Sequence, residues 1–171
     1  RKFIHNDKEY WKAFPSKVQE DSQPVFVLST GRCGTELLTN ALKLDKAALV
    51  HHAPFPELVY LDRWAYERKQ NTIKELESAI FAARFELIAD AVLRSRIYIE
   101  TNFRVTFFAN AIAQVFPRSK FIHLYRDPFD FVKSAIQLGF YEGMRTDIGR
   151  IIPTSSPQID WEAWAPHCRA G

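Results

Sequence analysis

The stretch Pro24-Val-Phe-Val-Leu-Ser-Thr-Gly-Arg-Cys-Gly-Thr35 decides the fold. Its first half is a continuous apolar run with β-branched members, which is typical of a strand buried on both faces of a parallel sheet. Its second half is a loop of small residues. A helical pattern over 36–44 follows, in which four apolar residues are spaced to share one face: Leu37, Leu38, Ala41 and Leu42. The stretch therefore predicts a strand, a tight loop and a helix in direct succession.

The rest of the chain repeats this alternation. Further apolar runs of strand length lie at 47–50, 97–100 and 120–125. Helical patterns lie at 71–87, with Asn71 as N-cap, at 105–116 and at 129–138. Strands that alternate with helices predict an α/β fold in three layers, with a mainly parallel central sheet flanked by helices.

The composition is that of a globular protein. Of 171 residues, 47% are hydrophobic and 25% are charged, which excludes a disordered or collagen-like chain. The net charge of +3 is too small to indicate nucleic-acid binding, and we expect no nucleic-acid partner. Cys33 and Cys168 are too few for a disulfide framework and are expected as free thiols.

The organisation of the chain follows from the same patterns. Residues 1–23 are predicted as an N-terminal arm or short helix, and 24–171 as one domain. No clear closing element follows the last helical pattern, so the hypothesis that this domain is incomplete at its C-terminus stays open. No apolar run approaches the roughly 20 residues that span a bilayer, and no signal-peptide pattern begins the chain. We therefore expect a cytoplasmic protein without a transmembrane segment.

The loop 29–35 has the composition of an anion site. Gly31 and Gly34 permit positive φ, so that successive N–H groups turn inward at the positive end of the following helix. Arg32 adds a fixed positive charge, and Thr35 adds a hydroxyl. The alternative is an ordinary strand–helix turn with a solvated arginine. The loop is no Walker A motif, because the lysine that should follow the second glycine is absent.

A second candidate for anion binding lies further along the chain. Arg126 ends the predicted strand 120–125, and Ser134 follows eight residues later, about two turns into the next helix. A guanidinium and a hydroxyl suit a phosphate, and ligands of parallel sheets bind at the carboxyl ends of the strands. The alternatives are a salt bridge of Arg126 with a neighbouring aspartate and a Ser134 hydroxyl bonded to its own helix. Two anion sites in one crevice fit a nucleotide with phosphates at both its 5′ and 3′ positions.

The two motifs, Ser29 to Thr35 and Arg126-Asp-Pro to Ser134, resemble those of sulfotransferases that use 3′-phosphoadenosine 5′-phosphosulfate (PAPS). The resemblance covers about residues 24–141. It implies a P-loop-like fold and metal-independent, in-line transfer of a sulfuryl group from PAPS to a hydroxyl or amine. The product nucleotide would be adenosine 3′,5′-bisphosphate.

The resemblance also implies roles for individual residues. Arg32 would contact the 5′-phosphosulfate and its bridging oxygen, and Arg126 and Ser134 would bind the 3′-phosphate. The 5′-phosphate would be lined by Gly31, Arg32, Cys33, Gly34, Thr35, Glu36 and Leu37. Cys33 stands where relatives carry Ser or Thr, and Glu36 where they carry Thr. A carboxylate beside a phosphosulfate repels it, so Glu36 is expected to point away or to pair with a base.

The general base is expected at a strand end beside the phosphosulfate. Successive residues of a strand face opposite ways, so only one of His51 and His52 can face the crevice. We predict His52, because relatives carry Glu at this place; His51, Glu57 and Glu100 remain alternatives. The alternative is that both histidines serve packing or lie in a loop without a catalytic role.

The acceptor is left open by the sequence. A carbohydrate, a lipid and a small hydroxylated metabolite all remain candidates, and the oligomeric state is not predicted. Aromatic residues that could stack on an acceptor lie near the C-terminus: Tyr141, Trp161 and Trp164. Two other functions compete with sulfuryl transfer, namely a P-loop-type nucleotide kinase and a nucleotide-binding descendant without catalytic activity.

Overall fold

The computed structural model describes residues 8–58 and 73–137, and the chain divides into two compact units, 1–126 and 127–171. The helices and strands of the first unit are α1 (Lys8–Asp21), β1 (Val25–Leu28), α2 (Thr35–Leu42), β2 (Ala48–His51), α4 (Ile73–Leu93), β3 (Ile97–Glu100), the 3-10 helix η1 (Phe103–Phe108), α5 (Ala109–Val115) and β4 (Lys120–His123). The second unit contains α6 (Pro128–Gln137). Each unit is described by itself.

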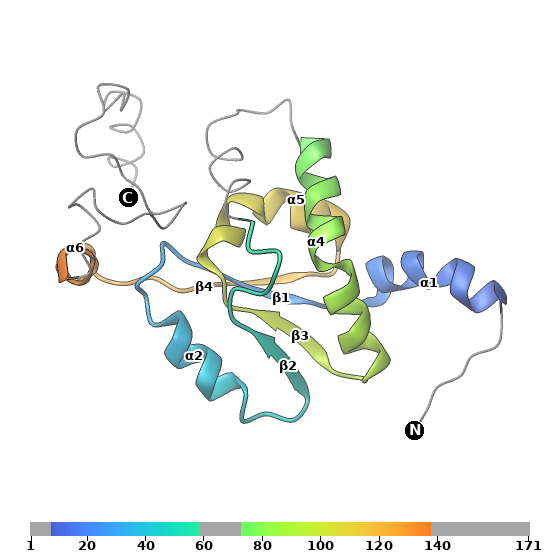
Figure 1. Ribbon diagram of the computed structural model, residues 1–171, viewed down its shortest axis with the longest axis horizontal. Helices are drawn as coiled ribbons and strands as arrows, with labels where there is room; N and C mark the ends of the chain where they lie inside the picture. The colour runs from blue at the N-terminus through green and yellow to red at the C-terminus, as the bar shows by residue number, and fades with distance from the viewer. Residues whose placement is uncertain (1–7, 59–72, 138–171) are drawn as a thin grey trace. The chain divides into compact units, whose positions relative to one another are not determined.

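The four strands in the described part of the first unit are parallel and stand in the order β2-β3-β1-β4 (Figure 1). In the β1–β4 pair, Val25 lies opposite Lys120 and Leu28 lies opposite His123. The carboxyl ends of parallel strands meet at one edge of a sheet, which is called the carboxyl edge below. The loops after β1, β2, β3 and β4 therefore gather at the carboxyl edge.

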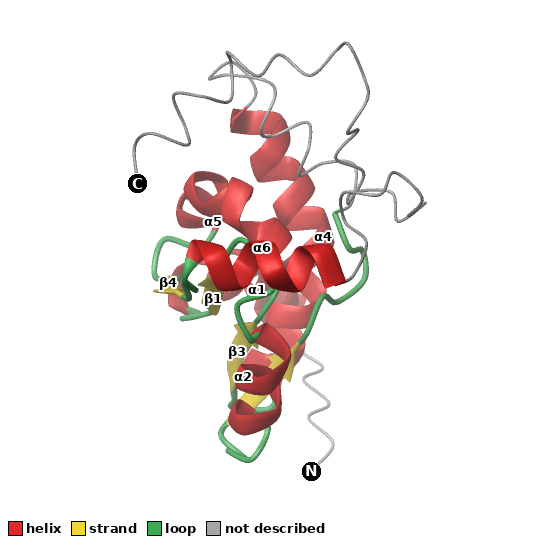
Figure 2. Ribbon diagram, turned by 90° about the vertical axis from the view of Figure 1, so that its left-hand side faces the viewer, coloured by secondary structure: helices red, strands yellow, loops and turns green. Residues whose placement is uncertain are grey.

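Helices cover both faces of this sheet. Helices α4 and α5 lie on one face and α2 lies on the other (Figures 1 and 2). The α4 side holds the apolar core, in which Phe26 of β1 meets Tyr98 of β3 with ring centroids 5.9 Å apart. The α/β fold with a parallel sheet in three layers, predicted from the alternation of strands and helices, is thus confirmed.

The apolar stripe predicted for α4 is buried at Leu76, Ile80 and Ala83, half-buried at Leu87 and exposed at Ile73. Its proposed N-cap Asn71 lies outside the described residues. The helix predicted over 105–116 differs at its start. It begins as the 3-10 helix η1, because the Asn102 side chain accepts a hydrogen bond from the Arg104 N–H and closes a tighter first turn.

The face predicted for α2 is wrong in part. Leu37 is 76% exposed and Ala41 is exposed as well, and the residue that α2 buries is Thr39. Leu38 and Leu42 are half-buried. The reason is that the Thr39 hydroxyl bonds to side chains at the ends of β2 and β3, so this side of α2 approaches the sheet through polar contacts.

A pair of leucine substitutions tests the placement of the core. Leu76→Ala removes a side chain that is 7% exposed and should lower the free energy of unfolding by about 2–5 kcal/mol. Leu44→Ala makes the same change at a position that is 85% exposed and should cost less than about 0.5 kcal/mol. Urea denaturation of both variants measures the difference, and equal losses would contradict the placement of Leu76.

Candidate functional site

The loop after β1 has the backbone geometry of an anion cradle. Gly31, Arg32 and Gly34 have φ of 80°, 53° and 87°, so the positive φ predicted for the two glycines is present, and Arg32 shares it. Helix α2 begins at Thr35, and Gly34 at its N-cap provides no side-chain hydrogen bond. The N–H groups of the first turn therefore lack partners within the helix, at its positive end. This arrangement suits a phosphate or sulfate group.

The loop is held in place by a threonine that the sequence analysis did not single out. The Thr106 hydroxyl donates to the Ser29 carbonyl (2.9 Å) and accepts from the Ser29 N–H (3.0 Å). Within the loop, the Ser29 hydroxyl accepts from the Gly31 N–H (3.3 Å) and the Cys33 thiol donates to the Gly31 carbonyl (3.0 Å). The Cys33 side chain is thus engaged with the loop's own backbone.

Arg126 connects the end of β4 to this loop. Its Nη1 donates to the Arg32 carbonyl oxygen at 2.9 Å. The register of β1 and β4 explains the contact. Leu28 and His123 lie opposite each other at the ends of these strands. Gly31 follows Leu28 by three residues and Arg126 follows His123 by three, so Arg126 lies beside the loop that contains Arg32. A guanidinium has five N–H donors, so the same group has further donors for an anion. The structure therefore places Arg126 beside the loop, at the end of the sheet where both anion-binding groups were expected.

Ser134 lies in the second unit, in α6, where it is half-buried. Pro128 occupies the first turn of this helix, as predicted, and Asp127 Oδ1 accepts hydrogen bonds from the N–H groups of Phe129 (2.9 Å) and Asp130 (3.3 Å). Asp127 thereby caps α6. The pairing of Ser134 with Arg126 on one phosphate stays a prediction.

His51 and His52 face different environments, in agreement with the alternation of a strand. His51 is half-buried with its ring 5.3 Å from that of Tyr98, and its Nε2 has no hydrogen-bond partner among the described residues. Burial lowers the pKa of His51 below its ordinary value. His52 is exposed, and its Nδ1 lies 3.1 Å from the Thr101 hydroxyl. Of the two rings, that of His52 is the more accessible to a substrate.

Glu100, one of the alternative candidates for the base, is fully buried. Its carboxylate accepts four hydrogen bonds: from Arg84 Nε (2.6 Å) and Nη2 (2.9 Å), the Tyr98 hydroxyl (2.9 Å) and Asn102 Nδ2 (3.1 Å). Burial, and then the charge of Glu100, raise the pKa of Tyr98 well above its ordinary value. A carboxylate has about four acceptor positions, so Glu100 is saturated and serves the structure instead of proton transfer.

The segment after β2 is anchored by two arginines that the sequence analysis missed. Arg84 Nη1 donates to the Pro56 carbonyl at 2.9 Å, and Arg104 lies 3.6 Å from the carboxylate of Glu57. Arg84 follows Ile80 by four residues on the apolar stripe of α4. A basic residue within such a stripe is a signal for a buried ion pair.

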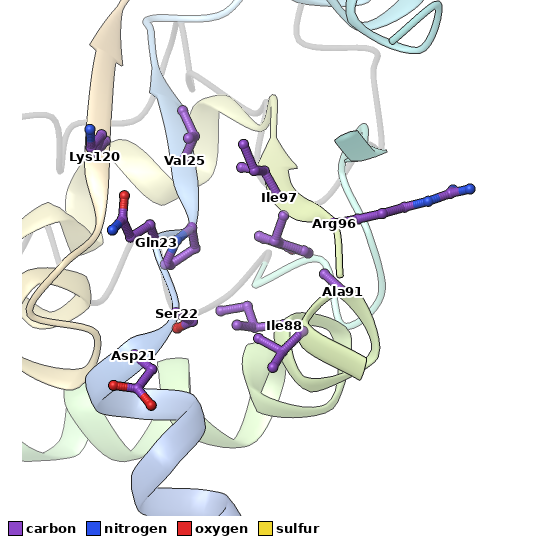
Figure 3. A pocket seen from close by; sticks show the side chains of 12 residues that line it. Asp21, Ser22, Gln23, Val25, Ile88, Ala91, Arg96, Ile97 and Lys120 are labelled. Carbon is purple, nitrogen blue, oxygen red and sulfur yellow. The ribbon is translucent and has the colours of Figure 1, made fainter. Parts of the chain in front are cut away.

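One pocket of about 320 Å³ lies at the other end of the sheet (Figure 3). It is lined by the first residues of β1, β3 and β4, which are Val25, Ile97 and Lys120, and by Ile88 of α4. These positions are the amino ends of the strands. The pocket is therefore separate from the anion loop and contributes nothing to it.

Comparison with known proteins identifies the family. Residues 24–170 match the sulfotransferase family, so the chain belongs to that family and the predicted resemblance is confirmed. Membership supports sulfuryl transfer, and with it an enzyme, as the general activity. Neither the curated proteins nor the solved structures gave a match. No helix in the described part of the chain has the length and apolar character needed to cross a membrane.

The buried ion pair gives a test of this architecture. Glu100→Gln keeps the shape of the side chain but leaves the fully buried Arg84 without a counter-charge, which should cost about 3–5 kcal/mol of unfolding free energy. Asp90→Asn makes the same chemical change in an exposed pair with Arg94 and should cost at most about 1 kcal/mol. Chemical denaturation compares the two variants; similar losses would contradict the structural role of Glu100.

The environment of His51 predicts a pH dependence of stability. The pKa of His51 is lower in the folded protein than in the unfolded chain. As the pH falls to about 6.5 and below, His51 therefore binds a proton more readily in the unfolded chain than in the folded protein. The free energy of unfolding should therefore fall as the pH decreases from about 7.5 to about 5.5. His51→Phe keeps a ring against Tyr98 and should reduce this fall. Urea denaturation at both pH values measures it, and an unchanged fall in the variant would exclude His51 as a source.

Proposed function

We propose that the protein transfers a sulfuryl group from PAPS to a hydroxyl or amine of a small-molecule, lipid or carbohydrate acceptor, without a catalytic metal. The proposal rests on family membership and on the bond from Arg126 to the Arg32 carbonyl, which brings two candidate anion-binding groups to one edge of the sheet. PAPS carries phosphates at its 5′ and 3′ positions and so needs two such groups.

The residues of the loop fit a phosphosulfate. A Cβ added at Gly34 would meet no atom within 4 Å, so the backbone there is open to a ligand. In the proposed complex Arg32 and the N–H groups of the first turn of α2 bind the 5′ end, with Gly31, Cys33, Gly34, Thr35, Glu36 and Leu37 lining it. Arg126 and Ser134 bind the 3′-phosphate.

The chemistry assigned to the chain has two parts. PAPS supplies the sulfuryl group, whose bond to the bridging phosphate oxygen breaks as a bond to the acceptor oxygen or nitrogen forms. Arg32 and the positive end of α2 stabilise the negative charge that develops on the bridging oxygen. His52 accepts the proton of the acceptor. The products are the sulfated acceptor and adenosine 3′,5′-bisphosphate.

A nucleotide-binding protein without catalytic activity is the second candidate. Glu36 lies in the first turn of α2, at the positive helix end that is expected to meet the phosphosulfate. Its negative carboxylate repels the negative phosphosulfate. A chain that binds the nucleotide but fails to turn over labelled PAPS with a broad panel of acceptors would support this second function.

Nucleotide binding tests the proposal directly. The protein should bind adenosine 3′,5′-bisphosphate equally well with and without EDTA, by isothermal titration. Arg126→Ala should weaken binding by about 2 kcal/mol, or about 30-fold, because a charged hydrogen-bond partner is lost. Arg118→Ala removes an exposed arginine before β4, at the amino end of the strand, and should leave the affinity unchanged. A preference for ATP with Mg²⁺ would overturn the proposal in favour of a kinase.

A further inference from the structure

A chain of hydrogen bonds runs from the start of α2 to His52. The Thr39 hydroxyl donates to the Thr35 carbonyl at 2.6 Å, and it is also hydrogen-bonded to the Thr101 hydroxyl. The Thr101 hydroxyl in turn lies 3.1 Å from His52 Nδ1. Thr39 and Thr101 are 2% and 0% exposed, so water does not compete for their protons.

The hydroxyls of Thr39 and Thr101 have one proton each, and this number decides which hydrogen bond each proton occupies. Two close oxygen–oxygen contacts are present, Thr35 carbonyl to Thr39 and Thr39 to Thr101, and each needs a proton between its atoms. A carbonyl has none, so the single hydroxyl proton of Thr39 lies on the contact with Thr35. The proton between Thr39 and Thr101 must then come from Thr101.

The remaining hydrogen bond, between Thr101 and His52, determines which ring nitrogen of His52 carries the proton. Because the Thr101 proton is directed at Thr39, the Thr101 oxygen can only accept from His52, and the proton between them belongs to Nδ1. A proton of Thr101 directed at the His51 carbonyl, 3.3 Å away, would leave the contact with Thr39 without one. The Thr39 oxygen, 3.4 Å from Nδ1, also acts as an acceptor and so favours the same arrangement.

We infer that Thr39 and Thr101 are positioning residues that hold neutral His52 in the tautomer with the proton on Nδ1. Nε2 then carries the lone pair, and a proton taken from the acceptor goes to Nε2 while Nδ1 keeps its own. The use of this lone pair as a base rests on the proposed function, whereas the tautomer itself does not.

The same bonds tie the base to the anion loop. Thr35 is the first residue of α2, whose N-terminus ends the loop, and Thr39 stands one turn further along this helix. Thr101 directly follows β3, and its N–H donates to the His51 carbonyl at 3.0 Å. The position of His52 is therefore set by the helix that begins at the anion loop and by the neighbouring strand.

Nuclear magnetic resonance tests the tautomer without any substrate. Long-range proton–nitrogen spectra of the isotope-labelled full chain at about pH 8.5 distinguish a protonated ring nitrogen from an unprotonated one. His52→Gln identifies the signal among the five histidines of the sequence. We expect the proton on Nδ1. A proton on Nε2, or a mixture of both tautomers, in the unmodified protein would overturn the inference.

Two variants and a matched control extend the test. Thr101→Val and Thr39→Val remove one hydroxyl each while keeping the branched shape, and should release His52 into a mixture of tautomers; Thr101→Ser should retain the Nδ1 proton. Turnover of labelled PAPS should fall about ten- to hundredfold in the valine variants and recover in the serine variant. Valine variants that keep the unmodified tautomer would overturn the inference. An Nδ1 proton without any sulfuryl transfer would leave the inference standing and reject the proposed function.

Discussion

The carboxyl edge of the sheet depends on one fully buried ion pair. Arg84 and Glu100 are both removed from water, where an unpaired charge is strongly unfavourable, so each requires the other and a full set of hydrogen bonds. Those bonds extend to Tyr98, to Asn102 and to the Pro56 carbonyl. Helix α4, the end of β3 and the segment after β2 are thereby fixed to one another, which gives the histidines at the end of β2 a rigid surrounding.

The neighbouring part of the edge is built in a different way. Around the loop after β1, neutral hydrogen bonds from Thr106 and one bond from Arg126 hold a backbone with positive φ at three positions. The N–H groups of the first turn of α2, which follows this loop, have no partners within the helix, whereas the ion pair uses all the acceptors of its carboxylate. The edge thus combines a buried carboxylate whose acceptors are all used with a helix N-terminus whose N–H groups have no partners within the helix.

Local patterns explain what the sequence could predict. Strand β1 (Val25–Leu28), the glycine loop and the opposed histidines follow from apolar runs, glycine conformation and a period of two. Contacts between distant residues could not be predicted in this way: Thr106 lies 77 residues from Ser29, and Thr101 lies 62 residues from Thr39. The exposure of Leu37 was missed because the side of α2 that approaches the sheet is polar.

This polar attachment of α2 has a thermodynamic consequence. Heat-capacity changes on unfolding come chiefly from newly exposed apolar surface. Detaching a helix whose buried residue is Thr39, and whose Leu37 is already in solvent, exposes comparatively little of it. The free energy of such a local opening therefore varies almost linearly with temperature, in contrast to the curved stability profile of the core around Phe26 and Ile80.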